Sequence, residues 1–128
     1  MIYIDSSVAL AYLLAEDRTP SPSLWREPLA SSRLLQFEVW TRIHARGLTD
    51  SHSQLVGLLL KRIHLLEMVV PVLARAFEPF PSPVRTLDAL HLASAEFLRV
   101  QGEPVIIASY DDRLVEVAQQ MGFPIADI

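Results

Sequence analysis

Short apolar runs alternate along the chain with longer segments in which apolar residues recur every three or four positions. The short runs are rich in β-branched residues and bounded by polar or turn-forming ones, which predicts buried strands. The longer segments predict amphipathic helices, each with one face turned to a core. We expect strands over residues 1–4, 66–72, 105–109 and 124–128. We expect helices over residues 8–15, 24–26, 33–46, 73–77, 86–100 and 111–121, and one from a cap within 49–51 to about 64.

Polar residues at the predicted helix ends support these boundaries. Ser6 or Ser7 can cap the first helix, because a hydroxyl accepts a hydrogen bond from a free first-turn N–H. Ser31 and Ser32 can cap the helix over 33–46 in the same way. A glycine, which readily adopts the left-handed conformation that ends many helices, follows three of the predicted helices, at Gly47, Gly102 and Gly122.

Strands that alternate with helices in so short a chain predict an α/β sandwich with a mostly parallel sheet. The length of 128 residues is close to the usual size of one domain. The proline-rich segment over 79–83 is expected to be a rigid connection and not a domain boundary, because neither side of it could form a core alone. We therefore expect a single domain over residues 1–128.

Composition excludes several classes of protein. Hydrophobic residues make up 51% of the chain and charged residues 20%, which excludes a disordered protein. The absence of cysteine excludes disulfides, zinc–thiolate sites, iron–sulfur clusters and thiol catalysis. The N-terminus lacks the basic segment of a signal peptide, and no apolar run approaches the roughly 20 residues that span a bilayer. We expect a soluble cytoplasmic protein with no membrane partner.

The net charge of −4 argues against a protein that binds nucleic acid through a broad basic surface. The positions of the acids are therefore informative. Asp5 ends the first predicted strand, and Asp111 follows the strand over 105–109 by two residues. Because ligands bind at the carboxyl ends of strands in parallel sheets, both acids are expected at the edge where sites form. Each is also explained as the cap of the helix that follows it.

Two further acids lie in the first halves of predicted helices. Asp88 is in the first turn of the helix over 86–100, where an acid also simply complements the helix dipole. Glu38 lies between apolar neighbours, so its carboxylate needs a partner, and Arg42 one turn later can supply one. If the four acids converge, they repel one another unless a cation neutralises them. Oxygen ligands without cysteine indicate Mg²⁺ or Mn²⁺, the metals of nucleases and phosphatases.

Four segments together resemble one known family. They are IYIDSSVAL at 2–10, SRLLQFEV at 32–39, LDALHLASA at 87–95 and ASYDDRL at 108–114. In their order and spacing the chain is similar to the PIN domain family, and within it to the VapC-type toxins of toxin–antitoxin pairs. The resemblance covers nearly the whole chain.

The resemblance implies a three-layer α/β/α fold and a Mg²⁺- or Mn²⁺-dependent endoribonuclease that cleaves RNA and so inhibits translation. It implies that Asp5, Glu38, Asp88 and Asp111 are the acidic quartet that holds the metal, with Asp112 as the alternative fourth acid. Ser7, Ser109 and Arg85 are implied as supporting residues, the serines to orient ligands or water. The arginine could hold the phosphate or pair with the quartet, although a solvated surface arginine explains it better. Without the quartet the chain has eleven acids and eleven bases, so its acidity no longer argues against an RNA substrate.

The family also implies partners. They are a VapB-type antitoxin that neutralises the toxin, the RNA substrate, and a second copy of the chain in a homodimer or a toxin–antitoxin hetero-oligomer.

Arg113 is a further candidate for contact with the phosphate, although a solvated surface arginine explains it better.

Other interpretations stay open at this point. His91 lies three residues after Asp88 and could act as a base, although a hydrogen-bonded structural histidine explains it better. A phosphoacceptor domain of the receiver type would need a lysine near a strand end, and Lys61, the single lysine, lies in a predicted helix. A catalytically inactive PIN-like binding or structural module is the stronger alternative.

Overall fold

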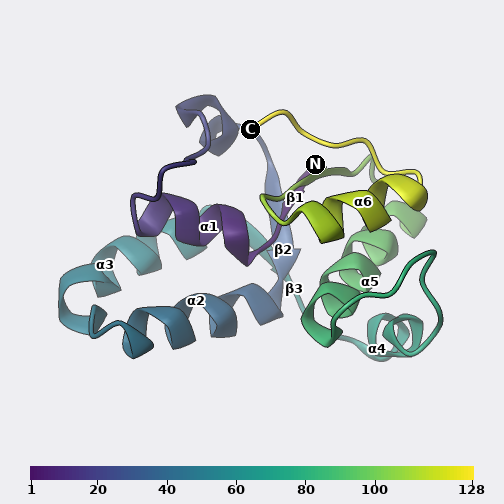
Figure 1. The fold of residues 1–128 in the computed structure, drawn as a ribbon, viewed down its shortest axis with the longest axis horizontal. Helices are drawn as coiled ribbons and strands as arrows, with labels where there is room; N and C mark the ends of the chain where they lie inside the picture. The colour runs from purple at the N-terminus through teal and green to yellow at the C-terminus, as the bar shows by residue number, and fades with distance from the viewer.

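A parallel four-stranded sheet lies between two groups of helices in the computed structural model, which describes all 128 residues (Figure 1). The strands are β1 (Ile2–Ile4), β2 (Leu29–Ser32), β3 (Ile63–Leu66) and β4 (Ile106–Ala108), in the order β3-β2-β1-β4. The helices are α1 (Ser6–Leu13), α2 (Arg33–Ala45), α3 (Thr49–Leu60), α4 (Val70–Ala76), α5 (Thr86–Val100) and α6 (Asp112–Gln120), and the 3-10 helix η1 spans Pro22–Arg26. This is the predicted three-layer α/β/α arrangement.

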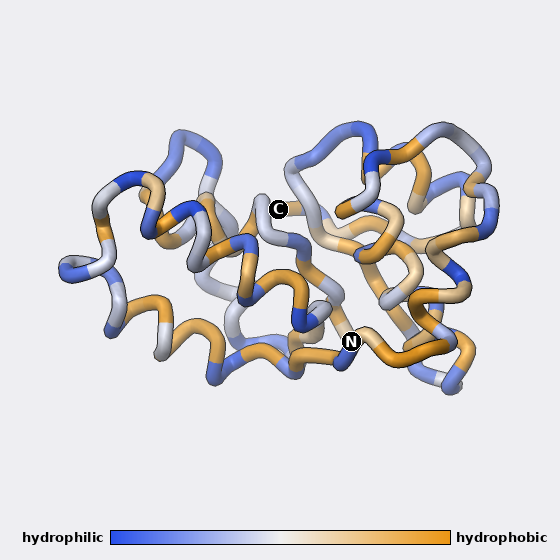
Figure 2. Tube along the Cα trace, turned by 90° about the horizontal axis from the view of Figure 1, so that it is seen from below, coloured by the Kyte–Doolittle hydropathy of each residue, from blue (hydrophilic) through white to orange (hydrophobic).

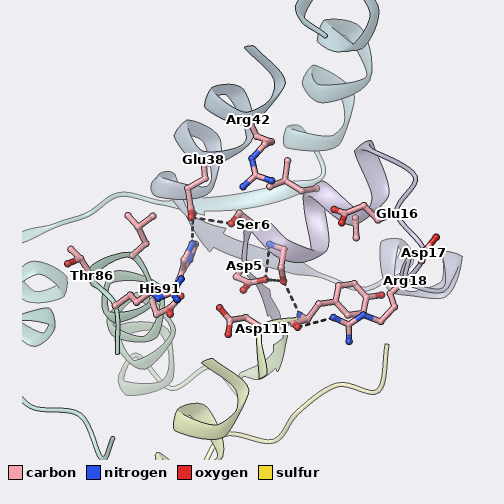
Figure 3. A pocket seen from close by; sticks show the side chains of 17 residues that line it. Asp5, Ser6, Glu16, Asp17, Arg18, Glu38, Arg42, Thr86, His91 and Asp111 are labelled. Carbon is pink, nitrogen blue, oxygen red and sulfur yellow. Dashed lines mark hydrogen bonds and ion pairs between the residues drawn. The ribbon is translucent and has the colours of Figure 1, made fainter. Parts of the chain in front are cut away.

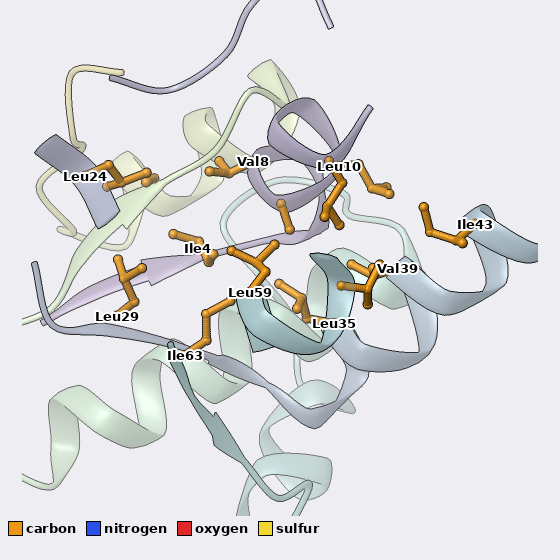
Figure 4. Packing of buried hydrophobic residues seen from close by; sticks show 14 residues of the cluster. Ile4, Val8, Leu10, Leu24, Leu29, Leu35, Val39, Ile43, Leu59 and Ile63 are labelled. Carbon is orange, nitrogen blue, oxygen red and sulfur yellow. The ribbon is translucent and has the colours of Figure 1, made fainter. Parts of the chain in front are cut away.

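Each face of the sheet has its own hydrophobic core, because successive side chains of a strand point to opposite faces. On one face, Ile4 and Ile63 pack against helices α1, α2 and α3 through residues such as Val39 (Figure 4). On the other face, Tyr3 packs against α5 and α6 through residues such as Leu92. Hydrophobic and hydrophilic residues alternate along the helices, as amphipathic helices that cover a sheet require (Figure 2).

The prediction of a strand over 66–72 is wrong, because this region ends one strand and begins a helix. β3 begins at Ile63, which is buried and pairs with Leu29 of β2, so the predicted helix to about 64 ends earlier, at Leu60. Pro71 lies in the first turn of α4, where its missing N–H breaks no helical hydrogen bond. The helix predicted over 73–77 is the second half of α4.

Strand β2 was not predicted. Its sequence LASS contains two serines, which the pattern assigned to helix capping. The structure gives the two serines different roles. Ser31 donates from its Oγ to the carbonyl of Ile4 at 2.7 Å inside the core, and Ser32 does accept a hydrogen bond from Leu34 N as the cap of α2.

The remaining differences concern element ends. The cap of α1 is Asp5, not Ser6 or Ser7, and the helix begins two residues before the predicted 8–15. The predicted strand over 124–128 is reduced to a single bridge between Ile107 and Ile125. The three glycines predicted to end helices all have positive φ, namely Gly47, Gly102 and Gly122.

Candidate active site

A polar cavity of about 750 Å³ opens at the carboxyl edge of the sheet. All four acids of the predicted quartet line it, together with Ser7, Arg85, His91 and residues of the segment after α1. These side chains come from the end of β1, from α1 and the segment after it, from α2, from the start of α5 and from the segment after β4. Figure 3 shows how the labelled ones meet at the cavity. The topology explains this convergence, because β1 and β4 are neighbours and parallel, so the residues that follow them meet at one edge.

Asp5 is the most deeply buried acid of the cavity, with 6% of its surface exposed. Its Oδ1 accepts hydrogen bonds from Ser7 N at 3.1 Å and Ser7 Oγ at 2.5 Å, and its Oδ2 accepts one from Ser109 Oγ at 2.6 Å. Burial raises the pKa of Asp5 above its ordinary value, and the bonds from Ser109 and Ser7 partly offset this by stabilising the charged form.

The two serines also connect the start of α1 to the start of α6. The Ser7 hydroxyl accepts a hydrogen bond from Tyr110 N at 2.9 Å, and the Ser109 hydroxyl accepts one from Asp111 N at 2.9 Å. Asp111 in turn accepts hydrogen bonds from the first-turn amides of α6 and caps this helix. The backbone that carries Asp111 is therefore fixed relative to Asp5.

Asp88 lies in the first turn of α5, is half-buried and makes no side-chain hydrogen bond. Burial raises its pKa, and the charges of Asp111 and Asp5 raise it further. The carboxylates of Asp5 and Asp111, which come from two other elements, are therefore close enough to Asp88 to disfavour its ionisation. Such a group favours a bound cation, because a cation removes the repulsion.

Glu38 approaches the cavity from α2 and is held at both oxygens. Its Oε1 lies 2.6 Å from Nε2 of His91, and its Oε2 accepts a hydrogen bond from Ser6 Oγ at 3.1 Å. The alternative partner Arg42 makes no ion pair with Glu38 and is exposed at the rim of the same cavity. The His91 ring from α5 takes the place of the arginine because α5 packs beside α2.

The structure separates the two candidates for the fourth acid. Asp111 lines the cavity, whereas Asp112 is exposed on α6 and is not part of the lining. Geometry therefore favours Asp111.

Three arginines line the cavity beside the acids. Arg85 was expected there, and Arg113 lies elsewhere on the surface. Arg18 and Arg42 were not predicted as site residues. Arg18 donates from Nη2 to the carbonyl of Tyr110 at 3.2 Å and lies over the Tyr110 ring, with 4.9 Å from its Cζ to the ring centroid. Sequence reasoning had no signal for Arg18, since it lies in an irregular segment far from Tyr110 in the chain.

The donor set fits a hard divalent cation. The candidate ligands are carboxylate oxygens with hydroxyls beside them, which suits Mg²⁺ or Mn²⁺ and not zinc. No three His, Asp or Glu side chains are arranged to hold an ion by themselves. Mg²⁺ does not require such a cage, because it keeps several waters and is bound through one or two carboxylates together with substrate phosphates.

Comparison with known proteins defines the class. The family model described as PIN domain matches residues 2–120, so the chain belongs to the PIN domain family, as the resemblance predicted. The chain is similar to Ribonuclease VapC47 of Mycobacterium tuberculosis (strain CDC 1551 / Oshkosh), with 30% identity over 96% of this chain and 93% of that protein. It is also similar to Ribonuclease VapC46 of Mycobacterium tuberculosis (strain ATCC 25618 / H37Rv), with 31% identity over 97% of this chain and 95% of that protein.

No helix is both long and apolar enough to cross a bilayer.

Proposed function

We propose that this protein is a divalent-metal-dependent endoribonuclease, a toxin of the VapC kind that cleaves RNA phosphodiester bonds and thereby inhibits translation. The observation that carries the proposal is that Asp5, Asp88 and Asp111 line one cavity at the carboxyl edge of the sheet, where the charges of Asp111 and Asp5 act on Asp88. The similarity of the chain to two ribonucleases over nearly its whole length supports the choice of RNA as substrate.

The residues of the cavity divide into two roles in this proposal. Asp5, Glu38, Asp88 and Asp111 hold Mg²⁺ or Mn²⁺, and hydrogen bonds from Ser7 and Ser109 orient Asp5 and favour its charged form. A bound divalent cation supplies water activation and stabilisation of the charge that develops on the phosphate. Arg85 and Arg42 at the rim attract the RNA backbone, because a guanidinium forms paired hydrogen bonds with phosphate oxygens.

The net charge of −4 is compatible with RNA as the substrate. Six acids line the cavity, namely the four of the quartet together with Glu16 and Asp17, and bound cations would cancel much of the charge of the quartet. Binding would then depend on the metal and on a few arginines near it, and not on a broad basic surface.

As a toxin of this kind, the protein would have a VapB-type antitoxin as its partner. We expect a tail of that antitoxin to cover the cavity and to place a basic side chain beside the acids, where opposite charges attract. The toxin would form a homodimer or a hetero-oligomer with the antitoxin. Reversing the charge on both sides should restore a complex that either single reversal weakens.

The alternative is a PIN-like module that binds partners without catalysis. The two functions differ in their response to metal. A nuclease site that binds Mg²⁺ or Mn²⁺ raises the thermal stability of the folded protein, whereas a module without a metal site does not.

The toxin function is tested by mapping new RNA ends after brief induction of the protein in cells. We expect the wild-type protein to stop growth and to produce recurrent new ends, and the Asp5→Asn variant to do neither. If both proteins give the same RNA ends as uninduced cells, the proposed function is wrong.

A further inference from the structure

We infer that His91 is a positioning residue that holds Glu38 in its place at the acidic cavity, with the Tyr3 hydroxyl fixing the histidine ring from behind. The inference rests on the proposed function, in which Glu38 is one of the metal-binding acids. Tyr3, His91, Glu38 and Ser6 form a single hydrogen-bonded chain that joins β1, α5, α2 and α1.

The His91 ring is fully engaged inside the protein. It is 2% exposed, its Nδ1 lies 2.8 Å from the Tyr3 hydroxyl, and its Nε2 lies 2.6 Å from Glu38 Oε1. Tyr3 also contacts the ring edge-on, with centroids 5.8 Å apart. Buried on all sides, the ring has one orientation in which both nitrogens are satisfied.

The direction of the hydrogen bonds follows from chemistry. A tyrosine hydroxyl keeps its proton at neutral pH, so the Tyr3 hydroxyl can donate it to Nδ1 of His91. Nε2 then carries the N–H that is donated to Glu38, since a carboxylate can only accept. The tyrosine thus orients the donor that the glutamate needs.

Glu38 has limited freedom once both of its oxygens are engaged. His91 binds one oxygen and Ser6 the other, which leaves further lone pairs on each for a cation in the cavity. Without the His91 donor, this carboxylate can pair with Arg42, which lies one turn later on the same helix and is exposed at the rim. We expect Glu38 to turn toward the rim in that case and to leave the other acids.

The test compares two amides of different reach at position 91. Glutamine places its N–H₂ group near the position of histidine Nε2, whereas asparagine is one methylene shorter and does not reach Glu38. We expect His91→Asn and His91→Leu to weaken Mn²⁺ binding, measured by calorimetry, by about 10- to 100-fold, as for other residues that orient a metal ligand. His91→Gln should stay within a few-fold of the wild-type protein. His44→Asn is the matched control, because His44 makes its own side-chain hydrogen bond on the exposed part of α2.

A double substitution separates positioning from a general structural role. If His91 acts through Glu38, His91→Asn should weaken Mn²⁺ binding in the wild-type background but add nothing to Glu38→Gln. Circular dichroism and thermal unfolding show which variants are folded. If His91→Leu does not fold, the comparison of His91→Gln with His91→Asn still tests whether His91 positions Glu38.

Two outcomes would overturn the inference. The first is equal Mn²⁺ affinities of His91→Gln and His91→Asn, whether reduced or at the wild-type value. The second is a loss from His91→Asn that multiplies with the loss from Glu38→Gln. These outcomes leave the proposed nuclease standing, provided that the wild-type protein binds Mn²⁺ and cleaves RNA. A wild-type protein that does neither removes the proposed function and this inference with it.

Discussion

The hydroxyl of Ser109 donates a 2.6 Å hydrogen bond to the buried carboxylate of Asp5, although the two residues are 104 positions apart in the chain. Parallel pairing of β1 with β4 creates this contact, because each residue follows its strand at the same edge. Burial alone would favour the protonated, uncharged form of Asp5, which binds cations poorly. The serine therefore supports the charge on which the proposed site depends.

Replacing Ser109 with alanine should destabilise the protein at neutral pH by about 1–3 kcal/mol, the cost of removing a hydrogen bond to a buried charged group. The loss should be smaller at pH 3, because Asp5 is then largely protonated in the folded and unfolded states alike. Urea unfolding at both pH values measures the difference. Ser23→Ala, which removes an exposed hydroxyl, is the control, and an equal loss for both variants would contradict the expectation.

Asp88 is expected to destabilise the metal-free protein at neutral pH. Its folded-state pKa is raised, so stability is lost as the pH rises through that value and Asp88 ionises beside Asp111 and Asp5. Asp88→Asn should therefore raise the unfolding temperature in EDTA at pH 7 by no more than a few degrees, since the half-exposed carboxyl is screened by solvent. The advantage should vanish below the ordinary pKa of an aspartate.

Magnesium should reverse this order. Mg²⁺ at about 100 times its Kd stabilises a folded protein that binds it by about 2.7 kcal/mol. We expect that gain in the wild-type protein and little of it in Asp88→Asn. Thermal unfolding with and without Mg²⁺ measures both, and an equal shift in the two proteins would show that Asp88 does not bind the ion.

Asp111 and Asp112 form a matched pair of neighbours. Asparagine also caps helices well, so Asp111→Asn should keep α6 intact while removing a charge from the cavity. We expect a loss of RNA cleavage of about 100-fold or more for Asp111→Asn, since the ion it holds supplies several kcal/mol. Asp112→Asn should keep near wild-type cleavage. The opposite ranking would make Asp112 the fourth acid.

Arg85 is expected to contact an RNA phosphate. Arg85→Gln should weaken RNA binding and reduce the slope of log K against log salt concentration by about 1, the contribution of one phosphate contact. Fluorescence anisotropy in the Asp5→Asn background, which is not expected to cut the RNA, provides this slope. Arg113→Gln removes an exposed arginine outside the cavity and should leave the slope unchanged. Equal slopes for both variants would exclude a specific role for Arg85.

The fold followed from the sequence wherever an element had a strong apolar pattern, as α5 and β1 do. It did not follow for β2, because small serines can occupy a buried parallel strand when their hydroxyls bond to the backbone, as Ser31 does to Ile4. It did not follow at Pro71 either, since a proline fits the end of a strand and the first turn of a helix equally well in sequence.

The candidate site followed from topology only in part. Asp5 and Asp111 were placed together because residues after parallel strands share an edge. The contact of His91 with Glu38 depends on how α5 lies against α2, and no local pattern carries that information. The sequence predicted a hydrogen-bonded structural role for His91. It did not predict the hydrogen-bond partners, because Tyr3 and Glu38 lie far from His91 in the chain.

We propose above that the acids of this cavity hold a divalent cation and that the protein cleaves RNA at this site. The most direct test is RNA cleavage by the purified wild-type protein and its Asp5→Asn and Asp88→Asn variants, each with Mg²⁺ and with EDTA. We predict cleavage by the wild-type protein with Mg²⁺ only, and a loss of about 100-fold or more in both variants. Cleavage that persists in EDTA, or at the wild-type rate in both variants, would contradict the claim.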